Sequence, residues 1–174
     1  MRWCEIKTED IADGPGVRVS LFVSGCTHHC KGCFNEATWD FSYGKEFTDI
    51  EVNEIIVACN KPYMAGLTIL GGEPFEEENQ PAVLDLMRKF HAALPEKNIW
   101  VYSGYVLHRD LLAGCRKHID GVTDEILKLA DVIVDGPFIK DMRDLTLRFR
   151  GSGNQRILVN EGGVWRQASN PVEA

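Results

Sequence analysis

Hydrophobic and polar positions along this chain alternate between a strand-like and a helix-like period. Residues 17–23 begin with apolar side chains at every second position and end in an apolar run, as in a strand that becomes buried. Residues 67–70, 99–102, 132–134 and 156–159 are further short apolar runs bounded by polar turns. These segments predict a sheet of about five or six strands.

Helical periodicity fills the intervals between these strands. Thr48 and Glu51 form a capping box, in which each side chain bonds a free backbone N–H at the start of a helix. The apolar face of this helix is made of Val52, Ile55, Ile56 and Cys59. A second helix is predicted from Asn79, and its apolar face is made of Val83, Leu86, Met87, Phe90 and Leu94. Shorter helical stretches are predicted at 107–115 and 123–130.

The alternation of strands and helices predicts the fold class. Such alternation is typical of β-α units that build a parallel sheet, and right-handed crossovers place the helices on one side of a sheet that curls. A complete eight-stranded barrel needs about 250 residues, more than the 174 present. We therefore expect an α/β fold in which residues 1–174 form a single domain, an open, partial parallel β/α barrel. The pattern alone leaves a doubly wound sheet as the alternative.

Composition narrows the classes of function. The 19 Lys and Arg residues against 26 Asp and Glu residues give a net charge of −7. A general nucleic-acid binder is not expected, because that binding displaces counterions with clustered basic side chains. No apolar run approaches the roughly 18–20 residues of a membrane span, and Glu5 lies where a signal peptide would begin its apolar core. We therefore expect a cytoplasmic protein with neither a nucleic-acid nor a membrane partner.

Polar, glycine-bearing turns follow four of the predicted strands. These turns are Cys26–Cys33 after Val23, Gly71–Pro74 after Leu70, Ser103–Gly104 after Tyr102, and Asp135–Pro137 after Val134. Parallel α/β sheets build their sites at the carboxyl ends of their strands. One such turn would be an ordinary loop, but four together predict a site.

Three of the six cysteines lie within the first of these turns, at the spacing C-x3-C-x2-C. Three thiolates so close together can hold an iron–sulfur cluster or a zinc ion. Structural zinc takes four ligands, so His28 or His29 would have to supply the fourth; otherwise both histidines are expected to be solvated. A four-iron cluster held by three cysteines instead leaves one iron open for a substrate. The other cysteines are expected to be small buried side chains: Cys4, Cys59 and Cys115.

The same residues carry a resemblance to a known superfamily. The cysteine spacing followed by Phe34 resembles the signature of radical S-adenosylmethionine enzymes, and Gly71-Gly72-Glu73-Pro74 resembles their second motif. The upstream Asp13-Gly14-Pro15-Gly16-Val17-Arg18 is similar to the activases of glycyl radical enzymes. Four segments resemble the family of activases that serve anaerobic ribonucleoside-triphosphate reductase: Val23–Asn35, Trp100–Tyr105, Val134–Phe138 and Phe149–Arg156. The match runs in order from about Asp10 to Leu158, and residues 159–174 receive no role.

This resemblance implies two cofactors. Cys26, Cys30 and Cys33 would ligate a [4Fe–4S] cluster, whose fourth iron would bind the amino and carboxylate groups of S-adenosylmethionine. Glu73 would accept a hydrogen bond from the methionine ammonium. The glycines of its turn would let the backbone approach this ligand, since they carry no Cβ. The expected contacts of S-adenosylmethionine are Gly32, Cys33, Phe34, Gly71, Gly72, Glu73, Pro74, Ser103 and Asp135.

The resemblance also implies the reaction and its partners. One electron, from reduced flavodoxin or a ferredoxin-type donor, would cleave S-adenosylmethionine to methionine and a 5′-deoxyadenosyl radical. That radical would take a hydrogen from a glycine of the anaerobic ribonucleoside-triphosphate reductase, leaving a glycyl radical. The turn at residues 13–16, with Arg18 beside it, would lie against the partner. Three further arginines are either surface charges or contacts for a carboxylate or the partner: Arg148, Arg150 and Arg156.

Three other functions stay open. The first is activation of another glycyl radical enzyme such as pyruvate formate-lyase, although the turn after Asp135 lacks a Lys found in those activases. The second is a radical enzyme acting on a small molecule, which a short chain with an uncovered site disfavours. The third is a non-catalytic iron–sulfur or zinc module. Metal content distinguishes a zinc module from an iron–sulfur cluster, since a cluster would give about four irons per chain and a zinc module about one zinc.

Overall fold

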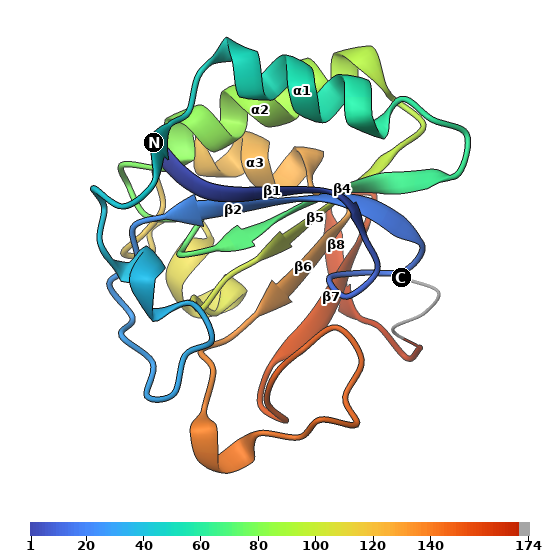
Figure 1. The fold of residues 1–174 in the computed structure, drawn as a ribbon. Helices are drawn as coiled ribbons and strands as arrows, with labels where there is room; N and C mark the ends of the chain where they lie inside the picture. The colour runs from blue at the N-terminus through green and yellow to red at the C-terminus, as the bar shows by residue number, and fades with distance from the viewer. Residues whose placement is uncertain (171–174) are drawn as a thin grey trace.

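The chain forms one eight-stranded sheet in a computed structural model that describes residues 1–170 (Figure 1). The strands run across the sheet in the order β3-β1-β2-β4-β5-β6-β7-β8. Their bounds are Arg2–Asp10 for β1, Val17–Ser24 for β2, Lys45–Glu46 for β3, Met64–Gly71 for β4, Asn98–Tyr102 for β5, Val132–Asp135 for β6, Arg156–Glu161 for β7 and Val164–Gln167 for β8.

Strand pairing is parallel in the centre of the sheet and antiparallel at both edges. The pairs β2–β4, β4–β5 and β5–β6 are parallel, whereas β1–β2, β1–β3, β6–β7 and β7–β8 are antiparallel. The α/β class and the open sheet are as predicted, but an all-parallel sheet of about five or six strands is wrong. Parallel strands need a crossover of a dozen or more residues, so the short links at 11–16 and 162–163 make the pairs β1–β2 and β7–β8 antiparallel.

Three α-helices cover one face of the sheet, which we call the helix face; the opposite side is the open face (Figure 1). They are α1 at Asp49–Cys59, α2 at Gln80–Ala93 and α3 at Thr123–Leu129. The predicted capping box of Thr48 and Glu51 is present at the start of α1. The predicted helix at 107–115 is reduced to one π-helical turn, Leu107–Leu111, because the chain becomes extended at Leu112. None of the helices within residues 1–170 has both the length and the apolar character needed to cross a bilayer.

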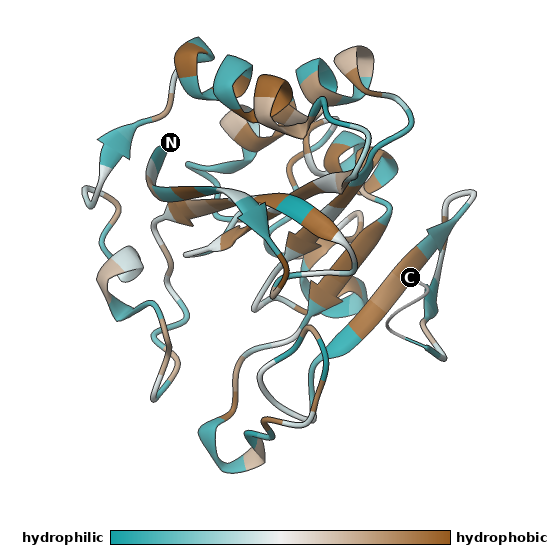
Figure 2. Cartoon of the chain, turned by 45° about the vertical axis from the view of Figure 1, so that its right-hand side comes forward, coloured by the Kyte–Doolittle hydropathy of each residue, from teal (hydrophilic) through white to brown (hydrophobic). Residues whose placement is uncertain are grey.

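One row of apolar residues crosses the helix face from β2 to β7. Leu21, Ile69, Val101, Ile133 and Leu158 lie opposite one another in successive strands, and all are buried in the main core. The central strands are accordingly the most continuously apolar part of the chain in Figure 2. Because successive side chains of a strand point to opposite faces, the neighbouring residues face the open side.

The open face carries a second, smaller apolar cluster and several polar groups. Trp100, Val132, Val134 and Ile157 form that cluster. Arg18 is fully buried beside it, with its guanidinium 5.4 Å from the centre of a Trp100 ring. The prediction that Arg18 lies on an exposed docking surface is therefore wrong. The residue begins β2 in an alternating segment, and its side chain turns inward.

Neutral oxygens hold the buried Arg18 guanidinium. Nε donates to Thr68 Oγ1 at 2.7 Å and Nη2 donates to the Leu67 carbonyl at 2.9 Å. Burial lowers the pKa of Arg18 to about 10, so the guanidinium stays charged at neutral pH.

The turn at residues 11–16 folds back onto the open face. Thr68 Oγ1 donates to the carbonyl of Asp13 at 2.9 Å, and a Cβ on Gly14 would lie 2.7 Å from the Arg18 side chain. Burial, together with a hydrogen bond to Asp10 and the charge of that residue, raises the pKa of Asp13 to about 7. Ser20 Oγ donates to the other carboxyl, Asp10, at 2.7 Å. The two aspartates thus share a partly buried site beside Arg18.

The C-terminal residues left without a role in the sequence complete the sheet. The predicted strand at 156–159 continues to Glu161, and β8 then pairs with it as the edge strand. Residues 171–174 lie outside the described residues.

Candidate functional site

A cavity of about 190 Å³ opens at the carboxyl ends of the parallel strands. The predicted site residues on its wall are Cys26, Cys30, Cys33, Phe34, Gly71, Gly72, Glu73 and Ser103. Wall residues that were not among the predicted cofactor contacts include His28, Trp39, Tyr102, Gly104, Gly136, Phe138, Gly151 and Gln155. Gly32, Pro74 and Asp135 are not part of this wall. The four glycine-bearing turns therefore do converge on one place.

Backbone hydrogen bonds fix the start of the cysteine turn. Gly25 N donates to the Thr38 carbonyl at 2.8 Å, and Cys26 N donates to the Trp39 carbonyl at 3.2 Å. Gly25 has φ +95°, and a Cβ there would lie 2.3 Å from the Phe41 ring. Only glycine allows the chain to leave β2 in this direction. Cys26 thereby enters the cavity wall from a fixed strand end, with 7% of its surface exposed.

Burial favours the protonated form of two of the thiols, Cys26 and Cys30. Burial raises the pKa of Cys26 to about 12, and the charges of Glu73 and Glu76 add to this rise. Burial also raises the pKa of Cys30. Since metals bind the thiolate, loading this site must release protons.

The donor set fits a cluster with three cysteine ligands. Within residues 1–170, no three His, Cys, Asp or Glu side chains converge on one point where a single ion would sit. The thiols are instead spread along the wall of a cavity of about 190 Å³. Both nearby histidines have other neighbours: His28 contacts Glu73, and the His29 ring lies 4.6 Å from that of Trp39. Three thiols in a roomy cavity suit a four-iron cluster.

The two glycines of the Gly-Gly-Glu-Pro turn are required by backbone packing. A Cβ on Gly71, which has φ +106°, would lie 2.7 Å from Val23 N, and one on Gly72 would lie 2.7 Å from the Gly25 carbonyl oxygen. Gly72 N donates to the Val23 carbonyl at 2.7 Å, and Glu73 N donates to the Gly25 carbonyl at 2.9 Å. The end of β4 therefore packs closely, backbone to backbone, against the end of β2 and the start of the cysteine turn.

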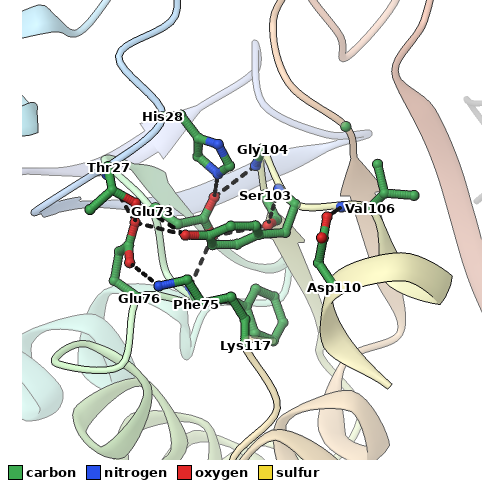
Figure 3. Close-up of polar contacts among 12 residues, drawn as sticks. Thr27, His28, Glu73, Phe75, Glu76, Ser103, Gly104, Val106, Asp110 and Lys117 are labelled. Carbon is green, nitrogen blue, oxygen red and sulfur yellow. Dashed lines mark hydrogen bonds and ion pairs between the residues drawn. The ribbon is translucent and has the colours of Figure 1, made fainter. Parts of the chain in front are cut away.

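The Glu73 carboxylate is buried and accepts four hydrogen bonds (Figure 3). Oε1 accepts from Phe75 N at 2.9 Å and Ser103 Oγ at 2.9 Å. Oε2 accepts from Gly104 N at 2.7 Å and lies 3.0 Å from His28 Nε2. A carboxylate has about four acceptor positions, so all are taken. The expected bond from a methionine ammonium would have to replace one of these donors.

Asp135 lies in a different environment from the one predicted. Its fully buried carboxylate pairs with Arg156, whose Nε lies 2.9 Å from Oδ1, and it accepts from Leu107 N at 2.8 Å. This pair joins the π-helical turn to β7. Arg150 has a local partner as well, since its Nη1 donates to the Gln155 carbonyl at 2.8 Å.

Aromatic and basic side chains lie at one side of the cavity wall. Phe34 is 67% exposed, its ring centre lies 5.7 Å from that of Phe138, and the Arg143 guanidinium lies 4.9 Å from it. Gly32 has φ +74° and faces the side chain of Lys140. The long connection between β6 and β7, at the bottom of Figure 1, thus meets the cysteine turn.

Comparison with known proteins agrees with this geometry. Residues 12–158 match the family model described as "4Fe-4S single cluster domain". A protein of Salmonella typhi is 38% identical over 159 residues, which cover 90% of this chain and 97% of that protein. A protein of Enterobacteria phage T4 is 39% identical over 166 residues, 95% of this chain and 99% of the relative. A third, from Vibrio cholerae, is 40% identical over 151 residues, 85% of this chain and 91% of the relative.

All three relatives bear one name, "anaerobic ribonucleoside-triphosphate reductase-activating protein". The chain belongs to this family of activating proteins. The family resemblance based on the motifs is therefore confirmed.

The burial of His28 in the site of this activating protein was not predicted from the sequence. His28 was expected to be solvated, but its side chain is only 14% exposed. Its ring lies 4.3 Å from that of Tyr105 and closes against Gly104. The signal available in the sequence was its place between two cysteines, which indicates proximity to the site but names no partner.

Proposed function

We propose that this chain activates anaerobic ribonucleoside-triphosphate reductase by producing a glycyl radical on it. Membership in the activating-protein family supports the reductase as the partner. One observation carries the chemistry: three thiols and the Gly-Gly-Glu-Pro turn share one open cavity at the carboxyl edge of the parallel strands. Four parallel strands with helices on one face also support an open, partial β/α barrel of the radical S-adenosylmethionine type.

In this proposal Cys26, Cys30 and Cys33 hold a [4Fe–4S] cluster, and S-adenosylmethionine is the cosubstrate. When bound and given one electron by a flavodoxin or ferredoxin-type donor, this pair would supply methionine and a 5′-deoxyadenosyl radical, and the radical would take a Cα hydrogen from a glycine of the reductase. Six of the nine cosubstrate contacts expected from the sequence line the cavity: Cys33, Phe34, Gly71, Gly72, Glu73 and Ser103.

The chain's own residues would hold the loops of the site in place, exclude water from one side of it and leave it open to a segment of the partner. Glu73 links three loops, since it bonds Ser103 and Gly104 and contacts His28. The aromatic pair of Phe34 and Phe138 would exclude water from one side. The cavity is open, which suits a protein segment more than a small molecule that needs its own enclosed pocket. The turn at residues 13–16, on the open face, remains the proposed contact for the partner's glycine segment.

Electron paramagnetic resonance tests this function. Anaerobically reconstituted, reduced chain with S-adenosylmethionine alone should release 5′-deoxyadenosine slowly. Addition of the reductase should give a glycyl radical signal, because only a docked partner brings a Cα within roughly 3–3.5 Å of the reacting carbon. A signal with pyruvate formate-lyase but not with the reductase would show that the partner is wrong. No signal with either would contradict activation itself, and about one zinc per chain in place of iron would favour a zinc module.

A further inference from the structure

We propose that Glu76 is a positioning residue for the cysteine turn and acts through Thr27, Tyr105 and Lys117. The inference rests on the proposed function, because it concerns the cluster that this function requires. Glu76 is not part of the cavity wall, so it is not expected to touch either cofactor. Its effect would reach the cluster through the residue that follows the first cysteine.

The Glu76 carboxylate is the centre of a compact network (Figure 3). It is 1% exposed. Oε1 accepts from the backbone N of Thr27 at 2.9 Å and from the hydroxyl of the same residue. Tyr105 Oη donates to Oε1 at 3.0 Å, and Lys117 Nζ donates to Oε2 at 2.9 Å. Such a set satisfies a buried carboxylate almost completely.

The network holds a part of the chain that has few other anchors. Thr27 itself is exposed, yet both its N–H and its hydroxyl are directed to Glu76. The next residue, His28, is held by Glu73. Two carboxylates of one turn therefore hold the two consecutive residues that follow Cys26. Groups that orient the ligands of a metal site commonly change its affinity when they are removed.

The network is also a pair of opposite charges near the cluster site. Burial opposes ionisation of Glu76, but hydrogen bonds from Thr27 and Lys117 outweigh it and lower the pKa of this carboxyl. The Lys117 side chain is 18% exposed, and its ammonium lies 5.4 Å from the centre of the Tyr105 ring. Removal of one partner would leave the other charge uncompensated. Because net charge and hydrogen bonding set the reduction potential of an iron–sulfur cluster, the two removals should act in opposite directions.

The test compares Glu76→Gln with Lys117→Met in the full chain after anaerobic reconstitution. In Glu76→Gln we expect cluster retention to fall by about 10–100-fold, the range for loss of groups that orient metal ligands. We also expect its reduction potential to become more positive and that of Lys117→Met to become more negative. A loosening of the fold would shift both potentials in the same direction.

Two further variants keep the result interpretable if Glu76→Gln folds poorly. Thr27→Val removes the hydroxyl but keeps the backbone bond, so it should weaken retention less, and Thr27→Ser should match the original chain. Glu51→Gln is the matched control, because it makes the same change from carboxylate to amide at the start of α1, where Glu51 Oε2 accepts from Thr48 N at 2.7 Å. The amide oxygen can still accept this bond, so the control should leave cluster retention and the reduction potential unchanged.

The outcomes separate this inference from the proposed function. An original chain that holds no four-iron cluster would overturn both. An original chain that holds the cluster, with Glu76→Gln and Thr27→Val equal to it in retention and potential, would overturn the role of Glu76 alone. A shift of both potentials in one direction would also overturn it.

Discussion

The two faces of the sheet are built from the same strands but contain different chemistry. The helix face is a continuous apolar core, as the row through Leu21, Ile69 and Val101 illustrates. The open face buries a charged guanidinium at Arg18, together with Ser20 and Thr68. Burying a charge on neutral partners costs free energy that an apolar side chain would not cost. Alternate residues of one strand therefore have different roles: those on the helix face stabilise the fold, and those on the open face include the polar groups.

The largest effect is expected when the cysteines that line the cavity are compared with the cysteine of the helix-face core. Cys30→Ala, like Cys26→Ala and Cys33→Ala, should abolish the cluster, because only three thiols line the cavity. Cys59→Ala, in the helix-face core, should keep the cluster and cost on the order of 1 kcal/mol of stability through a small cavity. Iron and sulfide analysis measures the first effect and urea unfolding the second.

Cys4→Ala and Cys115→Ala should also leave the iron content unchanged. If any of the three scattered cysteines proved necessary for the cluster, it would be a fourth protein ligand. The inference of an open iron would then be wrong.

The next largest effect is expected in the helix-face core itself. Leu86 of α2 is fully buried, so Leu86→Ala should lower the free energy of unfolding by about 2–5 kcal/mol. Urea denaturation of the metal-free chain measures this. His91→Ala, on the exposed side of the same helix, is the control and should change stability by no more than about 0.5 kcal/mol. A smaller loss for Leu86→Ala than for the control would contradict the assignment of this face as the core.

A third experiment addresses the junction between the faces. A Cβ on Gly72 would meet backbone oxygen of Gly25 at 2.7 Å, so Gly72→Ala should cost about 1–3 kcal/mol, as overpacking does. Because the clash lies beside Cys26, we expect iron retention to fall too. Gly72→Val should be worse in both respects. Normal stability and iron content with weakened S-adenosylmethionine binding by calorimetry would instead mean that this glycine serves only the ligand.

The smallest expected effect is a pH dependence on the open face. The folded chain raises the pKa of Asp13 from 3.8 to about 7, so its contribution to stability is present below pH 4 and is lost as the pH rises to 7. Asp10, whose pKa is lowered, acts in the opposite sense. Because the opposite effect of Asp10 falls below about pH 4, stability should decrease between pH 4 and 7 through Asp13 and level off above that range. Urea midpoints at several pH values measure it, and Asp13→Asn should flatten the curve; an equally steep curve would contradict the shared site.

Much of the helix face could be predicted from sequence, because apolar periodicity reports burial directly. The outer antiparallel strands could not. β1 pairs with the edge strand β3 at Arg2 and Trp3, and it contains Glu5, Lys7 and Glu9 with no apolar run, since a strand near the edge of a sheet needs to bury little. The open face was equally hard, because a lone arginine among alternating residues gives no sign that it turns inward, as Arg18 does.

The candidate site divides in a similar way. The thiols and the Gly-Gly-Glu-Pro turn can be recognised in the sequence by their spacing and by their position after predicted strands. The pair of Asp135 with Arg156 and the network around Glu76 join residues far apart in the chain. No local pattern encodes such contacts, because they depend on which strands become neighbours. Function-bearing ligands were therefore easier to predict than the groups that orient them.

The cavity wall extends from Cys26 to Gln155 along the chain, which has a consequence for how the protein is made. Chains emerge from the ribosome with the N-terminus first, so all three thiols of the site appear before Phe138, Gly151 and Gln155 exist. Until then the cysteine turn stands beside an unfinished wall. The complete cavity wall is therefore available to iron and sulfide only after the chain has been made as far as Gln155.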